Sequence, residues 1–164
     1  LALMAEGVSK IYVVDVIDSR LKRAKELGAT ETINGKNVNP VEEVMRLTNG
    51  RGVDLIIETS GTDVASGQTI SMARKGGTIV FVGYNPSGHV TLPMSFALDK
   101  ELNFKTIFRY RHIYPMAIDA VSSGKIDIKR IVSDTWKFKD VQEAMTKCAD
   151  DKVNIIKGAI VMEK

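Results

Sequence analysis

The chain has 164 residues, and its 23 lysines and arginines exceed its 20 aspartates and glutamates by a formal charge of +3. Hydrophobic residues make up 44% and charged residues 26%, which is typical of a globular domain with a sizeable core. No stretch of eighteen apolar residues occurs, which excludes a membrane-spanning helix. The single cysteine, Cys148, excludes an internal disulfide framework, and with only two histidines a Cys/His structural zinc site is also excluded.

The N-terminal part predicts alternating helices and strands, because runs of β-branched residues are separated by helix caps and glycines. Asp18 can cap a helix that Gly28 ends as a left-handed C-cap, and Asn39-Pro40 is a strong helix start. In chain order we expect a helix end at residues 1–5, a strand at 11–14, a helix at 18–27, a weak strand at 32–33 and a helix at 40–48.

The rest of the chain continues the alternation. Arg74 and Lys75 are expected at the negative end of a helix that ends near Ala73, before a turn at Gly76-Gly77. The order of elements predicts an α/β fold with a doubly wound parallel sheet, whereas the C-terminal part is expected to form a second, more antiparallel unit. The expected elements are a strand at 53–57, a helix at 62–73, a strand at 78–82, a loop at 84–93, a short helix near 94–100, a strand at 104–108, a helix at 114–123, a strand at 131–138, a helix at 140–149 and a strand at 155–162.

Asp15 is the first candidate for a binding role. In a dinucleotide-binding sheet an acidic residue ends the second strand, about 20 residues after the glycine turn, and binds the adenosine ribose. Asp15 ends such a strand, but the G-x-G-x-x-G fingerprint is absent from this sequence. Taken alone, Asp15 is explained equally well as an aspartate that merely ends a strand. An acid at this position also suits other adenosine binders such as methyltransferases.

Arg20 can lie along the adenine or be a solvated arginine of the first helical turn. No Arg or Lys directly follows Asp15, whose charge would repel a 2′-phosphate, so NAD is favoured over NADP.

Three further segments are expected at the carboxyl ends of strands, where open α/β sheets bind ligands. They are residues 58–61, 82–84 and 107–110. Gly61 and Gly83 allow the backbone to approach a ligand closely, although ordinary turn geometry explains each glycine as well.

Several stretches resemble the zinc-type medium-chain dehydrogenases, and the resemblance covers nearly the whole chain. They are VVDVIDSRLKRAKELGAT, GVDLIIETSG, RKGGTIVFVG, and IFRY followed by PMAIDAVSSGKIDIKRIVS. The most similar branch is that of the sorbitol (polyol) dehydrogenases, with xylitol and related dehydrogenases near by. The Phe-Arg-Tyr segment points to this branch.

The resemblance implies roles for matching positions. Asp15 and Arg20 would hold the adenosine ribose of NAD. Arg109 and Tyr110 would reach the polyol or its water network, and a guanidinium and a hydroxyl suit a polyhydroxylated substrate. A surface ion pair for Arg109 and an interface contact for Tyr110 are the alternatives. The full set expected to bind the cofactor is Asp15, Arg20, Thr59, Val82, Gly83, Tyr84, Ile107, Phe108 and Arg109.

The same resemblance implies a catalytic zinc ion in the full-length enzyme, with ligands outside this chain. Zinc polarises the alcohol oxygen while a hydride passes to the nicotinamide. His89 and His112 lack metal-ligand spacing and are expected to be surface or structural residues, and Cys148 is expected to pack within an amphipathic helix.

We therefore expect residues 1–111 to be an NAD-binding Rossmann domain without its first strand. Residues 112–164 are expected to be a helix-and-strand segment that belongs to the catalytic domain. In the strand order 3-2-1-4-5-6 the first strand is central, so strands 2 and 4 would lack their shared neighbour. Each unpaired buried backbone group costs roughly 1–3 kcal/mol. The sequence is thus expected to be a piece of a longer enzyme that neither folds nor works on its own.

The leading functional hypothesis is an NAD-dependent dehydrogenase of polyols or other secondary alcohols, in which this chain supplies cofactor binding. A non-catalytic dinucleotide-binding or oligomerisation module is an alternative, and so is a threonine-dehydrogenase-like member of the same family. We expect a homodimer or homotetramer and a small-molecule substrate. The basic residues are scattered without a nucleic-acid motif, so no nucleic-acid partner is expected. The absence of an export signal predicts a cytoplasmic location.

Overall fold

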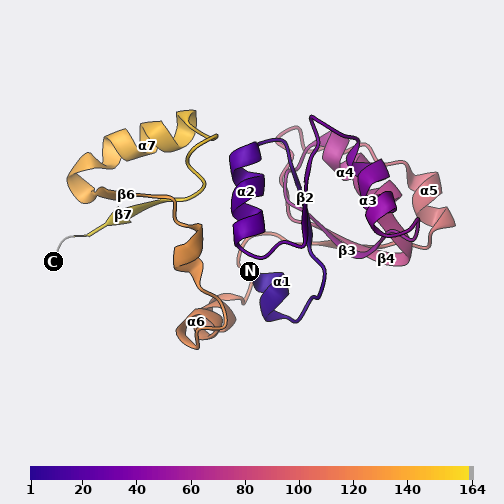
Figure 1. Cartoon of the computed structure of the whole chain (residues 1–164), viewed down its shortest axis with the longest axis horizontal. Helices are drawn as coiled ribbons and strands as arrows, with labels where there is room; N and C mark the ends of the chain where they lie inside the picture. Colours follow the sequence, from indigo (N-terminus) through magenta and orange to yellow (C-terminus); the bar gives the residue numbers. More distant parts are fainter. Residues whose placement is uncertain (163–164) are drawn as a thin grey trace. The chain divides into compact units, whose positions relative to one another are not determined.

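The computed structural model describes residues 1–162 as an α/β protein (Figure 1). The chain divides into two compact units. The first unit consists of Leu1–Lys36 together with the chain from His112 onward, and the second of Asn37–Arg111. Each strand pair in the described residues is parallel, as the alternation of strands and helices predicts. None of the helices in residues 1–162 is long and apolar enough to cross a membrane. The expected division into residues 1–111 and 112–164 stays a prediction.

The N-terminal part of the first unit is a strand–helix–strand arrangement. Its elements are α1 (Ala2–Ala5), β1 (Tyr12–Asp15), α2 (Asp18–Glu26) and β2 (Glu31–Asn34). β1 and β2 pair in parallel, with Asp15 opposite Asn34. α2 contacts both strands and buries Leu21.

Gly28 ends α2 in the way that the sequence predicts. Its φ is +107°, and its N–H donates to the Lys25 carbonyl at 3.0 Å. The N–H of Ala29 reaches back to the Ala24 carbonyl, also at 3.0 Å. These two bonds form a Schellman motif, which satisfies carbonyls that the end of the helix leaves unpaired.

The C-terminal part of the first unit is a second strand–helix–strand arrangement. Its elements are α6 (Tyr114–Ser122), the 3₁₀ turns η1 (Ile128–Ile131) and η2 (Phe138–Asp140), β6 (Asp134–Lys137), α7 (Val141–Asp150) and β7 (Gly158–Val161). β6 and β7 pair in parallel, so the expectation of an antiparallel unit is wrong. The physical reason is α7, which carries the chain back so that β7 runs in the same direction as β6. Cys148 of α7 is exposed, although its sulfur lies near Gly158 of β7, where an added Cβ would be 2.7 Å from it.

The second unit is a three-stranded sheet with the order β3-β4-β5. α4 packs on β3 and β4 and also contacts α3 and α5. The core of the second unit consists of Ile70, Ala73, Ile79 and Ala97, all nearly inaccessible to solvent. The elements are α3 (Pro40–Leu47), β3 (Val53–Glu58), α4 (Asp63–Met72), β4 (Ala73–Phe81), α5 (Met94–Asp99) and β5 (Asn103–Thr106).

The junction between α4 and β4 differs from the expectation. The helix ends at Met72, and β4 begins at once at Ala73, which pairs with Val53. Arg74 therefore lies in the sheet, where its Nε donates to the Asp54 carboxylate at 2.5 Å. The cation at the end of α4 is instead Lys100, distant in sequence. Its Nζ donates to the carbonyls of Ile70, Ser71 and Ala73 at 3.0, 2.8 and 2.8 Å.

Candidate coenzyme site

Asp15 lies at the carboxyl end of β1, and its carboxylate is held by the chain that follows. Its Oδ1 accepts the N–H groups of Val16 at 2.7 Å and Ile17 at 3.0 Å. The other oxygen, Oδ2, lies 3.9 Å from Nη1 of Arg20. The Asp15 side chain is 29% exposed. One oxygen thus fixes the orientation of the carboxylate, and the other faces a cation at ion-pair distance, too far for a hydrogen bond. A ribose diol could donate to this second oxygen.

Arg20 is also held in place, by a loop near the C-terminus. Its Nη2 donates to the carbonyl of Lys152 at 3.2 Å. The hydroxyl of the neighbouring Ser19 donates to the carbonyl of Val153. The loop itself is closed by Asp151, whose carboxylate accepts the backbone and side-chain N–H groups of Asn154 at 2.9–3.1 Å. These hydrogen bonds hold the pKa of Asp151 below its usual value.

In the second unit, three strands end in one row. Glu58 at the end of β3 is opposite Phe81 of β4, and Phe81 is opposite Thr106 of β5. Because parallel strands present their carboxyl ends at one edge, the segments that follow emerge together. These segments are 59–61, 82–84 and 107–110, and they include every residue of this unit that the sequence assigns to the coenzyme or substrate.

Glu58 begins the segment 58–61 that the sequence places at the ligand-binding edge, but no individual role was predicted for it. It is buried, and its Oε1 accepts the Ser60 N–H at 2.8 Å, the Ser60 hydroxyl at 2.5 Å and the Gly61 N–H at 3.0 Å. Thr59, between them, stays exposed. The available signal was an acidic residue at the end of a buried-type strand, followed at once by hydroxyl residues and a glycine.

The two glycines of the site bring the loops after β3 and β4 into backbone contact. A Cβ on Gly83 would lie 2.2 Å from the Gly61 nitrogen and 2.6 Å from Glu58 Oε2. A Cβ on Gly61 would lie 2.6 Å from the Tyr84 carbonyl oxygen, and Gly61 has a φ of +68°. Both positions therefore require glycine, and the close approach seen in the structure is between the loops themselves.

The segment after β5 extends the row. The Ile107 N–H still donates to the Phe81 carbonyl at 3.0 Å, although the strand expected to run to residue 108 ends at Thr106. Arg109 has a φ of +53°, and its guanidinium lies 5.0 Å from the centre of the Phe108 ring, which is a cation–π contact.

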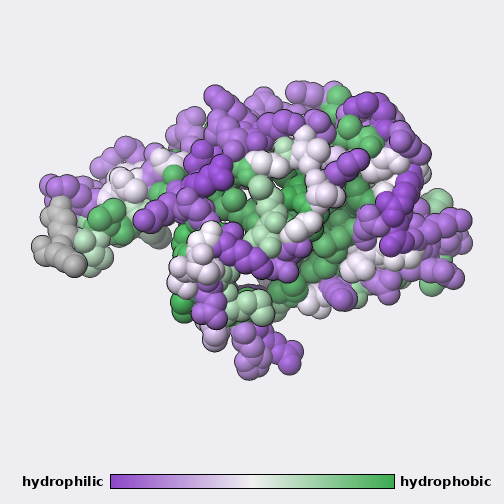
Figure 2. All heavy atoms as spheres, turned by 60° about the horizontal axis from the view of Figure 1, so that its bottom comes forward, coloured by the Kyte–Doolittle hydropathy of each residue, from purple (hydrophilic) through white to green (hydrophobic). Residues whose placement is uncertain are grey.

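Hydrophobic side chains are exposed along these segments. Figure 2 shows that hydrophobic side chains reach the surface between hydrophilic ones on the face in view. The large exposed side chains of the three segments are Val82, Tyr84, Ile107, Phe108 and Tyr110. An apolar surface beside backbone amides suits a planar heteroaromatic ring with an amide substituent, such as nicotinamide.

The structure therefore groups the predicted residues within two separate units. Asp15 and Arg20 belong to the first unit, where they lie side by side. The residues of the second unit lie at the common carboxyl edge of its sheet, and they are Thr59, Val82, Gly83, Tyr84, Ile107, Phe108, Arg109 and Tyr110.

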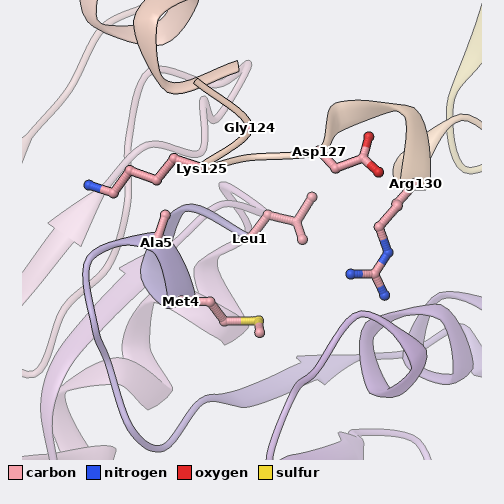
Figure 3. Close-up of a pocket in the computed structure, with 7 residues that line it drawn as sticks. All are labelled: Leu1, Met4, Ala5, Gly124, Lys125, Asp127 and Arg130. Carbon is pink, nitrogen blue, oxygen red and sulfur yellow. The ribbon is translucent and has the colours of Figure 1, made fainter. Parts of the chain in front are cut away.

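A pocket elsewhere in the first unit holds none of these residues (Figure 3). It has a volume of about 320 Å³, and Lys125, one of the residues that line it, pairs with Glu6 at 2.9 Å. Its lining residues are Leu1, Met4, Ala5, Gly124, Lys125, Asp127 and Arg130. Within residues 1–162 we find no group of three or more His, Cys, Asp or Glu side chains that could hold a metal ion.

Comparison with protein families gives a match over most of the chain. Residues 1–123 match the family model described as zinc-binding dehydrogenase. The chain belongs to the zinc-binding dehydrogenase family. The resemblance read from the sequence is thereby confirmed.

Curated relatives within this family include polyol enzymes. A sorbitol dehydrogenase of Bacillus subtilis is 35% identical over 156 residues, which is 95% of this chain and 44% of the relative. A D-xylulose reductase of Morganella morganii is 36% identical over 148 residues, 90% of this chain and 44% of the relative. The chain thus spans less than half the length of these curated relatives.

Solved structures of alcohol dehydrogenases share the fold. An alcohol dehydrogenase from Thermus sp. ATN1 is 30% identical with a TM-score of 0.89, over 99% of this chain and 46% of that one. A structure described as a short chain alcohol dehydrogenase from Escherichia coli CFT073, in complex with NADH, is 26% identical with a TM-score of 0.86, over 96% of this chain and 46% of that one. These likenesses confirm the expected α/β fold of the Rossmann type.

Proposed function

We propose that this chain is the coenzyme-binding part of an NAD-dependent dehydrogenase of polyols or other secondary alcohols. The observation that supports it most is the Asp15 carboxylate, fixed through Oδ1 by the backbone and turned with Oδ2 toward Arg20. A ribose diol has two hydroxyl donors for this carboxylate, whereas a 2′-phosphate would meet its negative charge. The proposal therefore favours NAD over NADP.

The residues of the second unit would receive the nicotinamide half of the coenzyme. The exposed Val82, Tyr84, Ile107 and Phe108 offer apolar contacts, and Gly83 lies between the first two on the same segment. Thr59 offers a hydroxyl at the end of the neighbouring strand. Holding the ring in place contributes orientation, which is a large part of the rate enhancement in hydride transfer.

The proposed reaction oxidises an alcohol to a ketone. A hydride leaves the carbinol carbon for the nicotinamide, and the hydroxyl proton is released. Arg109 and Tyr110 would hold further hydroxyls of a polyol, because a guanidinium donates from fixed directions and a phenol can donate or accept. A bound zinc ion would polarise the alcohol oxygen. We assign no zinc ligand to residues 1–162 and propose that the ligands lie outside this chain.

Substrate turnover tests this proposal. The full-length protein should reduce NAD with sorbitol or xylitol and should prefer NAD to NADP. Threonine is the matched competitor, since a threonine-dehydrogenase-like activity is the alternative within the family. Turnover of threonine without turnover of polyols would reject the polyol assignment, and binding of NADH without turnover of any alcohol would favour a non-catalytic module.

We also propose a homo-oligomer, for which the strand β5 provides the support. In the described residues β5 pairs only with β4, and all four of its residues are exposed. An exposed strand edge is a template for pairing with a second chain. Light scattering of the full-length protein should give a dimer or tetramer, and a monomer at micromolar concentration would reject the proposed oligomer.

The expected cytoplasmic location stays a prediction.

A further inference from the structure

Glu58 is the one ionisable side chain among the residues that the structure describes as buried, with an exposed fraction of 4%. Burying a carboxylate is costly unless hydrogen bonds compensate for the lost hydration. An apolar residue would occupy this buried position at lower cost. The position of this charge therefore calls for an explanation that strand packing does not supply.

The carboxylate of Glu58 holds the loop that follows β3. It accepts the Ser60 N–H, the Ser60 hydroxyl and the Gly61 N–H, and Oε2 also lies 3.1 Å from the Gly61 nitrogen. These bonds curl residues 60 and 61 back toward the end of β3 and leave Thr59 exposed. Without the carboxylate, the N–H of the buried Gly61 would lose its acceptor.

The same residue also holds the loop that follows β4. The main-chain carbonyl of Glu58 accepts the N–H groups of Val82 at 2.8 Å and Gly83 at 2.9 Å. The backbone of Gly61 lies directly against Gly83 and Tyr84. Glu58 therefore touches both loops, one through its side chain and the other through its main chain.

We propose that Glu58 is a positioning residue, which sets the two loops at residues 59–61 and 82–84 to receive the nicotinamide half of the coenzyme. The inference rests on the proposed function. Its physical basis is that a displacement of about 1 Å in a positioning group can lower the efficiency of a site by up to a hundredfold. A movement of Gly61 is transmitted to Gly83 and Tyr84, because these backbones are in contact.

The test separates the two halves of the coenzyme in the full-length protein. NADH affinity is measured from nicotinamide fluorescence, and ADP affinity from competitive inhibition against NAD. Because ADP has no nicotinamide, Glu58→Ala should weaken NADH about tenfold and leave ADP within about twofold. Glu58→Gln keeps one oxygen acceptor and should show a smaller loss of NADH affinity. It also serves as the readout if Glu58→Ala does not fold.

Ile70→Val is the matched control, because Ile70 lies in the core of the same unit at 0% exposure. It should lower the melting temperature and leave both affinities unchanged. Equal losses of NADH and ADP in Glu58→Ala would show a merely structural role and overturn the inference. Wild-type affinities in both Glu58 variants would also overturn it, while the proposed function would stand. A wild-type protein that fails to bind NADH would overturn both.

Discussion

Gly83 lies so close to Gly61 that a Cβ on Gly83 would be only 2.2 Å from the Gly61 amide nitrogen. The backbone of Gly61 cannot move aside for an added Cβ as the end of a flexible side chain can. Gly83→Ala should therefore destabilise the protein by about 1–3 kcal/mol, the usual cost of overpacking. Urea unfolding measures this change.

Gly67→Ala is the control for that substitution. Gly67 lies inside α4 with an ordinary φ, and an added Cβ would have its nearest contact at 3.8 Å, the carbonyl oxygen of Thr91. Alanine is the better helix former by about 0.5–1 kcal/mol, so this variant should be neutral or more stable. Equal destabilisation by both variants would contradict the close approach of the two loops.

Lys100 should contribute more to stability than the lysine that the sequence places at the end of α4. Its ammonium group donates to three carbonyls there, and partial burial lowers its pKa. Lys100→Met should cost about 1–3 kcal/mol, because the carbonyls lose their donor. Lys75→Met changes an exposed side chain and should stay within about 0.5 kcal/mol. The reverse order of the two effects in urea unfolding would contradict this assignment.

Acid should weaken the contacts at the start of β3. Hydrogen bonds from Arg51 and Arg74 lower the pKa of Asp54 to about 2. A carboxyl group with a lowered pKa in the folded state adds stability above its unfolded pKa, near 3.8, and this stability is lost as the pH falls toward 2. The unfolding free energy of the wild type should therefore fall more steeply between pH 4 and pH 2 than that of Asp54→Asn. Identical slopes would contradict this assignment.

Local signals in the sequence predicted the elements well. Asn39-Pro40 starts α3, and the Asn39 side chain accepts the Val41 N–H at 3.0 Å, as an N-cap should. Gly28 ends α2 by a Schellman motif. Both signals depend on residues that are close in sequence, so a single sequence contains the information they need.

Long-range contacts account for what the sequence did not predict. Arg74 was expected at a helix end, but Asp54, twenty residues earlier, binds it within the sheet. The parallel pairing of β6 with β7 depends on how α7 returns the chain, which periodicity does not encode. For Glu58 the residue type was visible, but its hydrogen bonds to Ser60, Gly61 and Val82 depend on how two loops fold together, which no local pattern encodes.

The central claim is that Asp15 selects NAD through the adenosine ribose. Its most direct test is titration of the full-length protein and its Asp15→Ala variant with NADH and NADPH. A hydrogen bond to a charged group is worth about 1.5–3 kcal/mol, so Asp15→Ala should weaken NADH roughly tenfold to a hundredfold. The affinity for NADPH should stay the same or improve, because the repelling charge is gone. Equal losses for the two coenzymes, or no loss for NADH, would contradict the account.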